Sequence, residues 1–185
     1  MPRKTRFTRE AVLDAALSVV RSEGLANVSA RTVARALGAS TAPVSSAFAN
    51  MQALGDAVVA AIVDALLAAI AATEGPDPLR SAALAMARFT ADQPRYYEAL
   101  FLHTHASPPD WVALRTGFSG PLGASPRYAA LDARERDALA WRASVVAHGM
   151  CIEIWSGRWT RTSDAALWRL VDQLVEPVIQ AAVAR

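Results

Sequence analysis

The chain has 185 residues, of which 53% are hydrophobic and 19% charged, and this balance excludes a disordered protein. Alanine accounts for 41 residues, and because alanine favours helices over strands, the composition predicts an all-α fold. The net charge of +2 is unevenly distributed, because residues 1–50 carry +4 and residues 51–185 carry −2. The excess of positive charge in residues 1–50 suggests a polyanionic partner for this part of the chain. The alternative is an ordinary arginine-rich surface exposed to solvent.

The first fifty residues predict three helices, which cover residues 8–23, 29–37 and 41–48. Gly24 ends the first helix, Ser29 caps the second, and the turn Gly38-Ala39-Ser40 leads to the third. Three short helices with such a turn before the last are typical of a helix-turn-helix DNA-binding domain. A plain three-helix packing unit is the alternative.

Residues 51–185 predict a body of six helices. Gly75-Pro76-Asp77-Pro78 breaks the first of them, and a stretch rich in Gly, Pro and Ser at residues 117–127 is expected to be the most mobile loop. The predicted helices cover residues 50–73, 78–92, 95–105, 110–116, 131–157 and 163–184. We therefore expect two domains, residues 1–50 for DNA binding and a helical body of residues 51–185.

Residues 7–54, FTREAVLDAALSVVRSEGLANVSARTVARALGASTAPVSSAFANMQAL, resemble the DNA-binding head of the TetR-type (TetR/AcrR) bacterial transcriptional regulators nearly end to end. The body resembles that family more weakly, through FTADQPRYYEALF and His148-Gly149. The resemblance implies a homodimer that binds double-stranded operator DNA and is most often a repressor released by a small-molecule effector. The matching residues in the head are Ala15-Ala16, Gly24, Val33-Ala34, Leu37-Gly38, Ser40, Val44, Phe48 and Leu54.

The expected recognition helix departs from the family pattern at Ser45, Ala47 and Met51, where members often carry Tyr, then His or Tyr, then Lys. Because no charged residue lies between Arg35 and Asp56, phosphate contacts must come from the N-terminal arm, other arginines and helix N-termini. Hydroxyl and methyl groups are then left to read base edges. The predicted DNA-binding residues are Arg3, Lys4, Arg6, Ser29, Arg31, Thr32, Ser40, Thr41, Ala42, Ser45, Ser46 and Asn50, with Arg9 as a further phosphate contact.

The body carries aromatic and sulfur side chains on helices that we expect to face one another, which predicts a mainly apolar effector pocket. The pocket is expected between the helices at 78–92, 95–105 and 131–157, with the 117–127 loop near its entrance. For each residue alone, core or dimer packing is the alternative. The predicted ligand-binding residues are Met86, Phe89, Tyr97, Phe101, Trp111, His148 and Trp155.

The last two predicted helices are long, and the final one carries a broad apolar stripe from Leu167 to Ile179. Two such helices packed against their symmetry mates would form a four-helix dimer interface, and the resemblance implies the same. Burial of the stripe within the monomer is the alternative.

We expect no metal, no cofactor and no enzymatic activity. His103 and His105 stand two residues apart and would point to different faces of a helix. His148 and Cys151 stand three apart, but no third group is evident to orient them as a nucleophile pair. The sequence also contains no recognisable catalytic or phosphate-binding motif.

We expect a cytoplasmic protein without a membrane segment. The basic first residues lead into an amphipathic helix rather than a signal peptide, and the longest uncharged stretch, residues 36–55, contains Gly, Pro and Asn. The alternative to a DNA-binding regulator is a helical ligand-binding or adaptor protein whose head has weakened or lost DNA binding, because the recognition helix is uncharged.

Overall fold

The computed structural model describes residues 7–105 and 107–184, which form helices joined by turns and contain no strand. This confirms the all-α class. The chain divides into two compact units, one of residues up to Ile62 with Arg95–Pro109, and one of Val63–Pro94 with the residues from Asp110 onwards. The boundary expected after residue 50 thus falls within the first unit, which also takes in the start of a long helix and residues 95–109.

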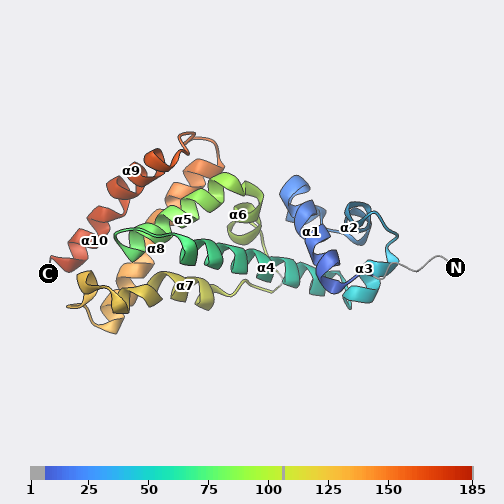
Figure 1. The fold of residues 1–185 in the computed structure, drawn as a ribbon, viewed down its shortest axis with the longest axis horizontal. Helices are drawn as coiled ribbons and strands as arrows, with labels where there is room; N and C mark the ends of the chain where they lie inside the picture. The colour runs from blue at the N-terminus through green and yellow to red at the C-terminus, as the bar shows by residue number, and fades with distance from the viewer. Residues whose placement is uncertain (1–6, 106, 185) are drawn as a thin grey trace. The chain divides into compact units, whose positions relative to one another are not determined.

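The first unit contains three helices that pack against one another (Figure 1). They share a core in which Ala16 and Val20 of the first helix are buried with Val33 of the second and Val44 of the third. Since alanine is small, Ala16 allows close approach of its neighbours. The elements are α1 (Arg9–Glu23), the 3-10 turn η1 (Leu25–Asn27), α2 (Ala30–Leu37), α3 (Ala42–Ala47), the first part of α4 (Met51–Ala72), and α6 (Pro94–Phe101) from Arg95 on.

α4 is long and strongly apolar. Within the described residues, it is the one helix whose length and composition would suit a membrane span, with a hydropathy of 2.1, but the core helix of a soluble protein passes the same test. Asp56 and Asp64 lie within it, and its buried residues recur every three or four positions, which places them on about half of the helix surface. This pattern is compatible with a soluble protein. The buried residues are Leu54, Val58, Val59, Ile62, Val63, Leu66 and Ile70.

The second unit is built around α5 (Pro78–Asp92), which packs against α7 (Trp111–Ser119), α8 (Ala133–Trp155) and α9 (Asp164–Leu174) (Figure 1). Ten of the fifteen residues of α5 are buried, and four of these are alanines. A helix that is buried on nearly all sides belongs to the centre of a core. α5 is therefore the central helix of this unit.

Two segments differ from the sequence predictions. The helix predicted over residues 163–184 is divided at Val175 into α9 and α10 (Glu176–Val183), because Pro177 lacks the amide hydrogen that a continuous helix would need. Residues 117–127 were predicted as a mobile loop, but they contain the 3-10 turns η2 (Gly120–Ala124) and the start of η3 (Pro126–Tyr128). Leu122 and Tyr128 are fully buried, which anchors this segment to the unit.

Candidate nucleic-acid interface and ligand cavity

The connection between α2 and α3 depends on Gly38. Its backbone is left-handed, with a φ of +67°, and the amide of Ala39 donates a 3.0 Å hydrogen bond to the carbonyl of Ala34. Glycine adopts this conformation without the penalty that a Cβ imposes. α2 therefore stops abruptly, and the chain turns within a few residues into α3, which is held by buried Val44.

α3 presents small hydroxyl-bearing side chains to its surroundings. Thr41, Ser45 and Ser46 are exposed. The Ser46 hydroxyl donates to the carbonyl of Ala42 at 2.9 Å, and the Ser45 hydroxyl donates to that of Thr41 at 3.4 Å. With their protons directed into the helix, both serine oxygens remain available as acceptors, which suits the amino groups that adenine and cytosine display in the major groove.

Three of the predicted DNA-binding residues cap helices. The Thr32 hydroxyl donates to the carbonyl of Asn27 at 2.7 Å and accepts from the amide of Ser29, whose own hydroxyl accepts from the amide of Thr32. The side-chain oxygen of Asn50 accepts a 2.8 Å hydrogen bond from the first turn of α4. These polar groups already have partners that hold the helix ends in place, whereas Ser40 is simply exposed.

The basic residues of the first unit differ in how they are held. The Arg9 guanidinium lies 4.3 Å from the centre of the Phe48 ring, and Arg35 pairs with Glu23 at 2.6 Å. Arg31 is exposed and makes no ion pair within residues 7–105 and 107–184. The predicted phosphate contacts Arg3, Lys4 and Arg6 lie outside the described residues.

Two of the predicted ligand-binding residues belong to the first unit. Tyr97 is fully buried, and its ring centre lies 5.1 Å from that of Phe101 in a tilted arrangement. Such a pair stabilises the packing of α6 beyond the area it buries. The structure thus brings these two together.

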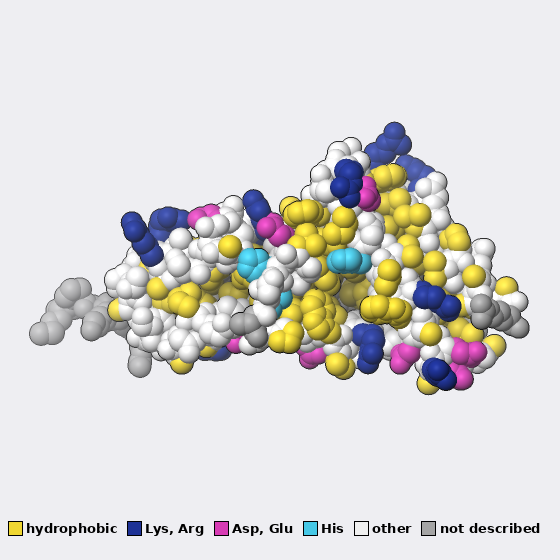
Figure 2. All heavy atoms as spheres, turned by 180° about the vertical axis from the view of Figure 1, so that it is seen from behind, with side chains coloured by type: hydrophobic (Ala, Val, Ile, Leu, Met, Phe, Trp, Pro, Cys, Tyr) yellow, Lys and Arg dark blue, Asp and Glu magenta, His cyan; other side chains and the backbone are white. Residues whose placement is uncertain are grey.

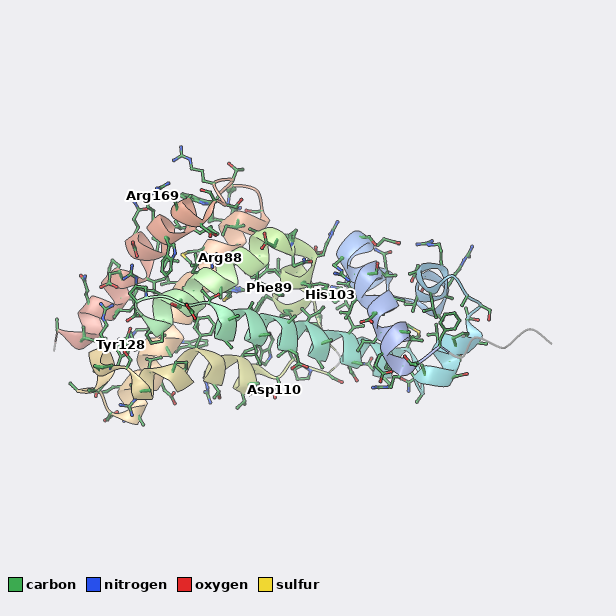
Figure 3. All side chains as sticks on the ribbon, viewed as in Figure 1. Arg88, Phe89, His103, Asp110, Tyr128 and Arg169 are labelled. Carbon is green, nitrogen blue, oxygen red and sulfur yellow. The ribbon has the colours of Figure 1, made fainter. Side chains whose placement is uncertain are left out.

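The other five lie in the second unit. Met86 and Phe89 are buried on α5, where Figure 3 labels Phe89. Trp111 and Trp155 are 46% and 38% exposed. His148 on α8 is half-buried, and this burial lowers the pKa of its imidazole because it disfavours the charged form. Met86 and Phe89 lie one turn apart on α5 and are both buried, whereas Trp111 and Trp155 are partly exposed to solvent.

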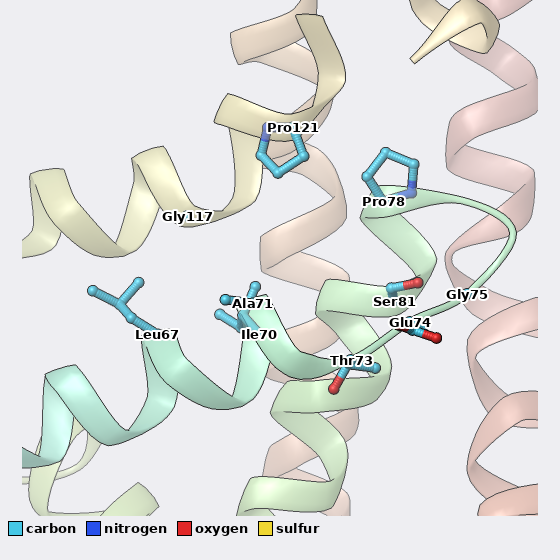
Figure 4. Close-up of a pocket in the computed structure, with 10 residues that line it drawn as sticks. All are labelled: Leu67, Ile70, Ala71, Thr73, Glu74, Gly75, Pro78, Ser81, Gly117 and Pro121. Atoms are coloured by element: carbon cyan, nitrogen blue, oxygen red, sulfur yellow. The ribbon is translucent and has the colours of Figure 1, made fainter. Parts of the chain in front are cut away.

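A cavity of about 690 Å³, partly open to solvent, lies within the second unit (Figure 4). It is enclosed by the end of α4, the segment that follows it, the first turn of α5 and the segment from Gly117 to Pro121. None of the seven predicted ligand-binding residues lines it. Its lining consists of Leu67, Ile70, Ala71, Thr73, Glu74, Gly75, Pro78, Ser81, Gly117 and Pro121.

A buried charge network lies next to this cavity, at the start of α5. Asp77 is 2% exposed, and it accepts hydrogen bonds from the α5 amides, from the Tyr128 hydroxyl at 2.6 Å and from Arg127 at 3.1 Å. Arg127 also forms an ion pair with Glu176 of α10, which lowers the pKa of that carboxyl. Tyr128 (Figure 3) has its pKa raised by burial and by donating to Asp77. The network ties η3 and α10 to the start of α5.

Sequence reasoning missed both the cavity and the network. Gly75 and Asp77 were read only as helix-breaking residues, and Arg127 only as the end of a loop. An aspartate after a Gly-Pro pair and before a proline is a signal for a helix cap, but its burial is not visible in the sequence.

The chain contains one cysteine and two neighbouring histidines, which are candidate catalytic or metal-binding groups. Burial raises the pKa of the Cys151 thiol to about 12, so it is protonated at neutral pH. The rings of His103 and His105 lie 6.1 Å apart. Among the residues that the structure describes, no three His, Cys, Asp or Glu side chains form a group that could hold a metal ion.

The chain was also compared with known proteins. No model of a protein family matches it, and no curated protein matches it.

Proposed function

We propose that this protein is a homodimeric DNA-binding transcriptional regulator, a repressor that a small-molecule effector releases from a palindromic operator in the cytoplasm. α2, the turn at Gly38 and α3 act as a helix-turn-helix, and α3 enters the major groove. The observation that carries the proposal is the division of α3 into two faces. Val44 is buried against α1 and α2, whereas Thr41, Ser45 and Ser46 are exposed.

α3 carries no charged residue, and we propose that arginines of α1 and α2 supply the positive charge for contacts to DNA phosphates. Arg9 is placed beside the end of α3 by its contact with Phe48, and Arg31 is exposed on α2. Phosphate contacts fix the position of a protein on DNA, whereas contacts to base edges provide its specificity. We assign the first role to the arginines and the second to the hydroxyls of α3.

Dimerisation is supported by an exposed apolar face on α8. At 100° per residue, positions 141, 145, 148, 152 and 155 fall within an arc of about 80°. Trp141 and Val145 in this arc are 62% and 51% exposed, and Trp155 is 38% exposed. Figure 2 shows hydrophobic side chains at the surface of the second unit. Two exposed tryptophans on one helix face suit a partner surface, for which we propose a second copy of the chain.

The alternative function is a helical ligand-binding or adaptor protein without DNA binding. It is favoured by one observation, the absence of any charged side chain between Arg35 and Asp56, which includes all of α3. In this case the small hydroxyls of α3 would be ordinary exposed helix residues.

Selection from a pool of random duplexes by the purified protein tests the proposed function. We expect enrichment of an inverted repeat whose half-sites lie about 34–36 Å apart, or a multiple of this distance, because two heads of a symmetric dimer must enter major grooves on one side of the DNA. Sedimentation should give the mass of a dimer. Enrichment of no sequence, from a protein that is folded and dimeric, would contradict DNA recognition and favour the alternative.

A further inference from the structure

We infer that the cavity of the second unit is a binding site for an uncharged, mainly apolar organic molecule that carries one hydrogen-bonding group. The inference concerns the protein alone and stands whether or not the first unit binds DNA. It rests on the size of the cavity, its lining, one buried hydroxyl and the distribution of charge around it.

The size and lining suit a small organic molecule. The cavity has a volume of about 690 Å³, within the range of about 300–1,000 Å³ that is usual for such sites. Leu67, Ile70 and Ala71 of α4 form one side, and Pro78 and Pro121 lie across from them (Figure 4). A site with these walls gains most of its affinity from apolar contact.

Ser81 provides the polar group. It is 5% exposed, and its hydroxyl oxygen is buried without a hydrogen-bond partner among the described residues. Gly75 lies close to this hydroxyl: a Cβ on Gly75 would lie 2.4 Å from the Ser81 oxygen and 2.9 Å from the Trp168 ring, so a side chain at position 75 would displace one of them. Buried polar groups in proteins are nearly always hydrogen-bonded. A ligand hydroxyl, carbonyl or amide would give Ser81 the partner that it lacks.

The charges around the cavity disfavour an anion. Among the residues that the structure describes, no Lys, Arg or His lines it, and the one ionisable lining residue is the carboxylate Glu74. The α5 N-terminus is not available to an anion either, because Asp77 already accepts from its amides and Arg127 is paired with Asp77 and Glu176. Glu74 is exposed, so its attraction for a cation is weak. A neutral molecule fits best.

Pyrene derivatives with one ring system and different substituents test this assignment by fluorescence anisotropy. The four probes are 1-pyrenemethanol, 1-methylpyrene, 1-pyrenemethylamine and pyrene-1-sulfonate. We expect 1-pyrenemethanol to bind most tightly, because it alone is neutral and carries a hydroxyl. Equal or tighter binding of the sulfonate or of the amine would overturn the inferred ligand class.

Variants of the lining test the location. Ala71→Leu fills the cavity from α4, and Ala72→Leu is its control, because Ala72 is equally exposed on the same helix but does not line the cavity. We expect Ala71→Leu to weaken 1-pyrenemethanol binding about tenfold or more and Ala72→Leu to leave it unchanged. Equal binding by the two variants would place the probe elsewhere. If Ala71→Leu fails to fold, Gly117→Ala serves instead, because its Cβ would lie 2.7 Å from a methyl group of Leu67, so that the Leu67 side chain in the cavity lining must shift.

Ser81→Ala tests the hydrogen bond. We expect it to weaken binding of 1-pyrenemethanol by about 3- to 10-fold, the net worth of one hydrogen bond, and to leave 1-methylpyrene unaffected. A purely structural role of Ser81 would change the affinity for both probes alike, and that result would overturn the assignment of Ser81.

Discussion

The two units use polar side chains in opposite ways. In the first unit, Thr41, Ser45 and Ser46 stay at the surface of a short helix. In the second unit, Asp77 is buried and joined to Arg127, so its charge is used to fasten segments together. The first arrangement leaves hydrogen-bonding capacity for a partner, and the second uses that capacity within the fold. The difference separates a surface for recognition from an internal anchor beside a cavity.

Substitution of Asp77, the centre of the buried charge network, should have the largest effect on stability. Asp77→Ala removes the cap of α5 and leaves Arg127 and the Tyr128 hydroxyl without their shared acceptor, so we expect the free energy of unfolding to fall by about 3–5 kcal/mol. Denaturant titration measures this. Asp92→Ala, at an exposed position of the same helix, should change it by no more than about 0.5 kcal/mol. Similar losses from both would show that the network does not anchor the unit.

Substitutions of the exposed hydroxyl residues of α3 should change DNA binding and not the free energy of unfolding. Thr41→Ala should relax the preference for one base pair of the selected operator, at a cost of about 1–3 kcal/mol, with little change in unfolding. Ser22→Ala, which removes an exposed hydroxyl of α1, is the matched control and should have no effect. Uniform weakening on all sequences would assign Thr41 to phosphate contact instead.

The turn between α2 and α3 should show a smaller effect on stability. In Gly38→Ala the new Cβ meets no atom within 4 Å, so any loss comes from the left-handed backbone alone, about 1–2 kcal/mol. Gly55→Ala, in α4 and equally free of contacts, should instead stabilise by about 0.5–1 kcal/mol. Thermal unfolding of both variants measures the contrast, and a shift of the same sign in both would refute this reason for Gly38.

The smallest expected effect is on the pH dependence of stability. Hydrogen bonds from Arg127 lower the pKa of Glu176 below its usual 4.5, so its contribution to stability is present above that value and is lost as the pH falls through the folded-state pKa. Glu176→Gln should therefore reduce the acid-side slope of stability against pH. An unchanged slope between about pH 5 and 3 would show that this pair does not contribute.

Local sequence signals were sufficient for most helix ends. Thr8 and Ser29 cap their helices as expected, because a hydroxyl before an apolar run satisfies free amides whatever the rest of the fold does. The division of the last helix at Val175 also has a local signal, Pro177, which the broad apolar stripe concealed. The limits of the helices are thus largely local properties.

The cavity and its anchor could not be predicted in this way. The cavity is lined by segments far apart in the chain: Gly75 and Gly117, both in its lining, are 42 positions apart. Asp77 has its long-range partners in η3, where Arg127 and Tyr128 lie 50 and 51 positions away, a distance over which residue patterns carry no information. The predicted ligand-binding residues remain a prediction, since aromatic side chains in helices serve cores and pockets alike.

The salt dependence of duplex binding tests the central claim most directly. Anisotropy of a labelled duplex carrying the selected operator would be measured over a range of salt concentrations for the unmodified protein and for Arg31→Ala. If the first unit binds DNA, the logarithm of the association constant falls linearly with that of the salt concentration, and Arg31→Ala reduces the slope by about 0.9 for one lost phosphate contact. Binding that does not change with salt, or no binding to any duplex by the folded dimer, would contradict the account.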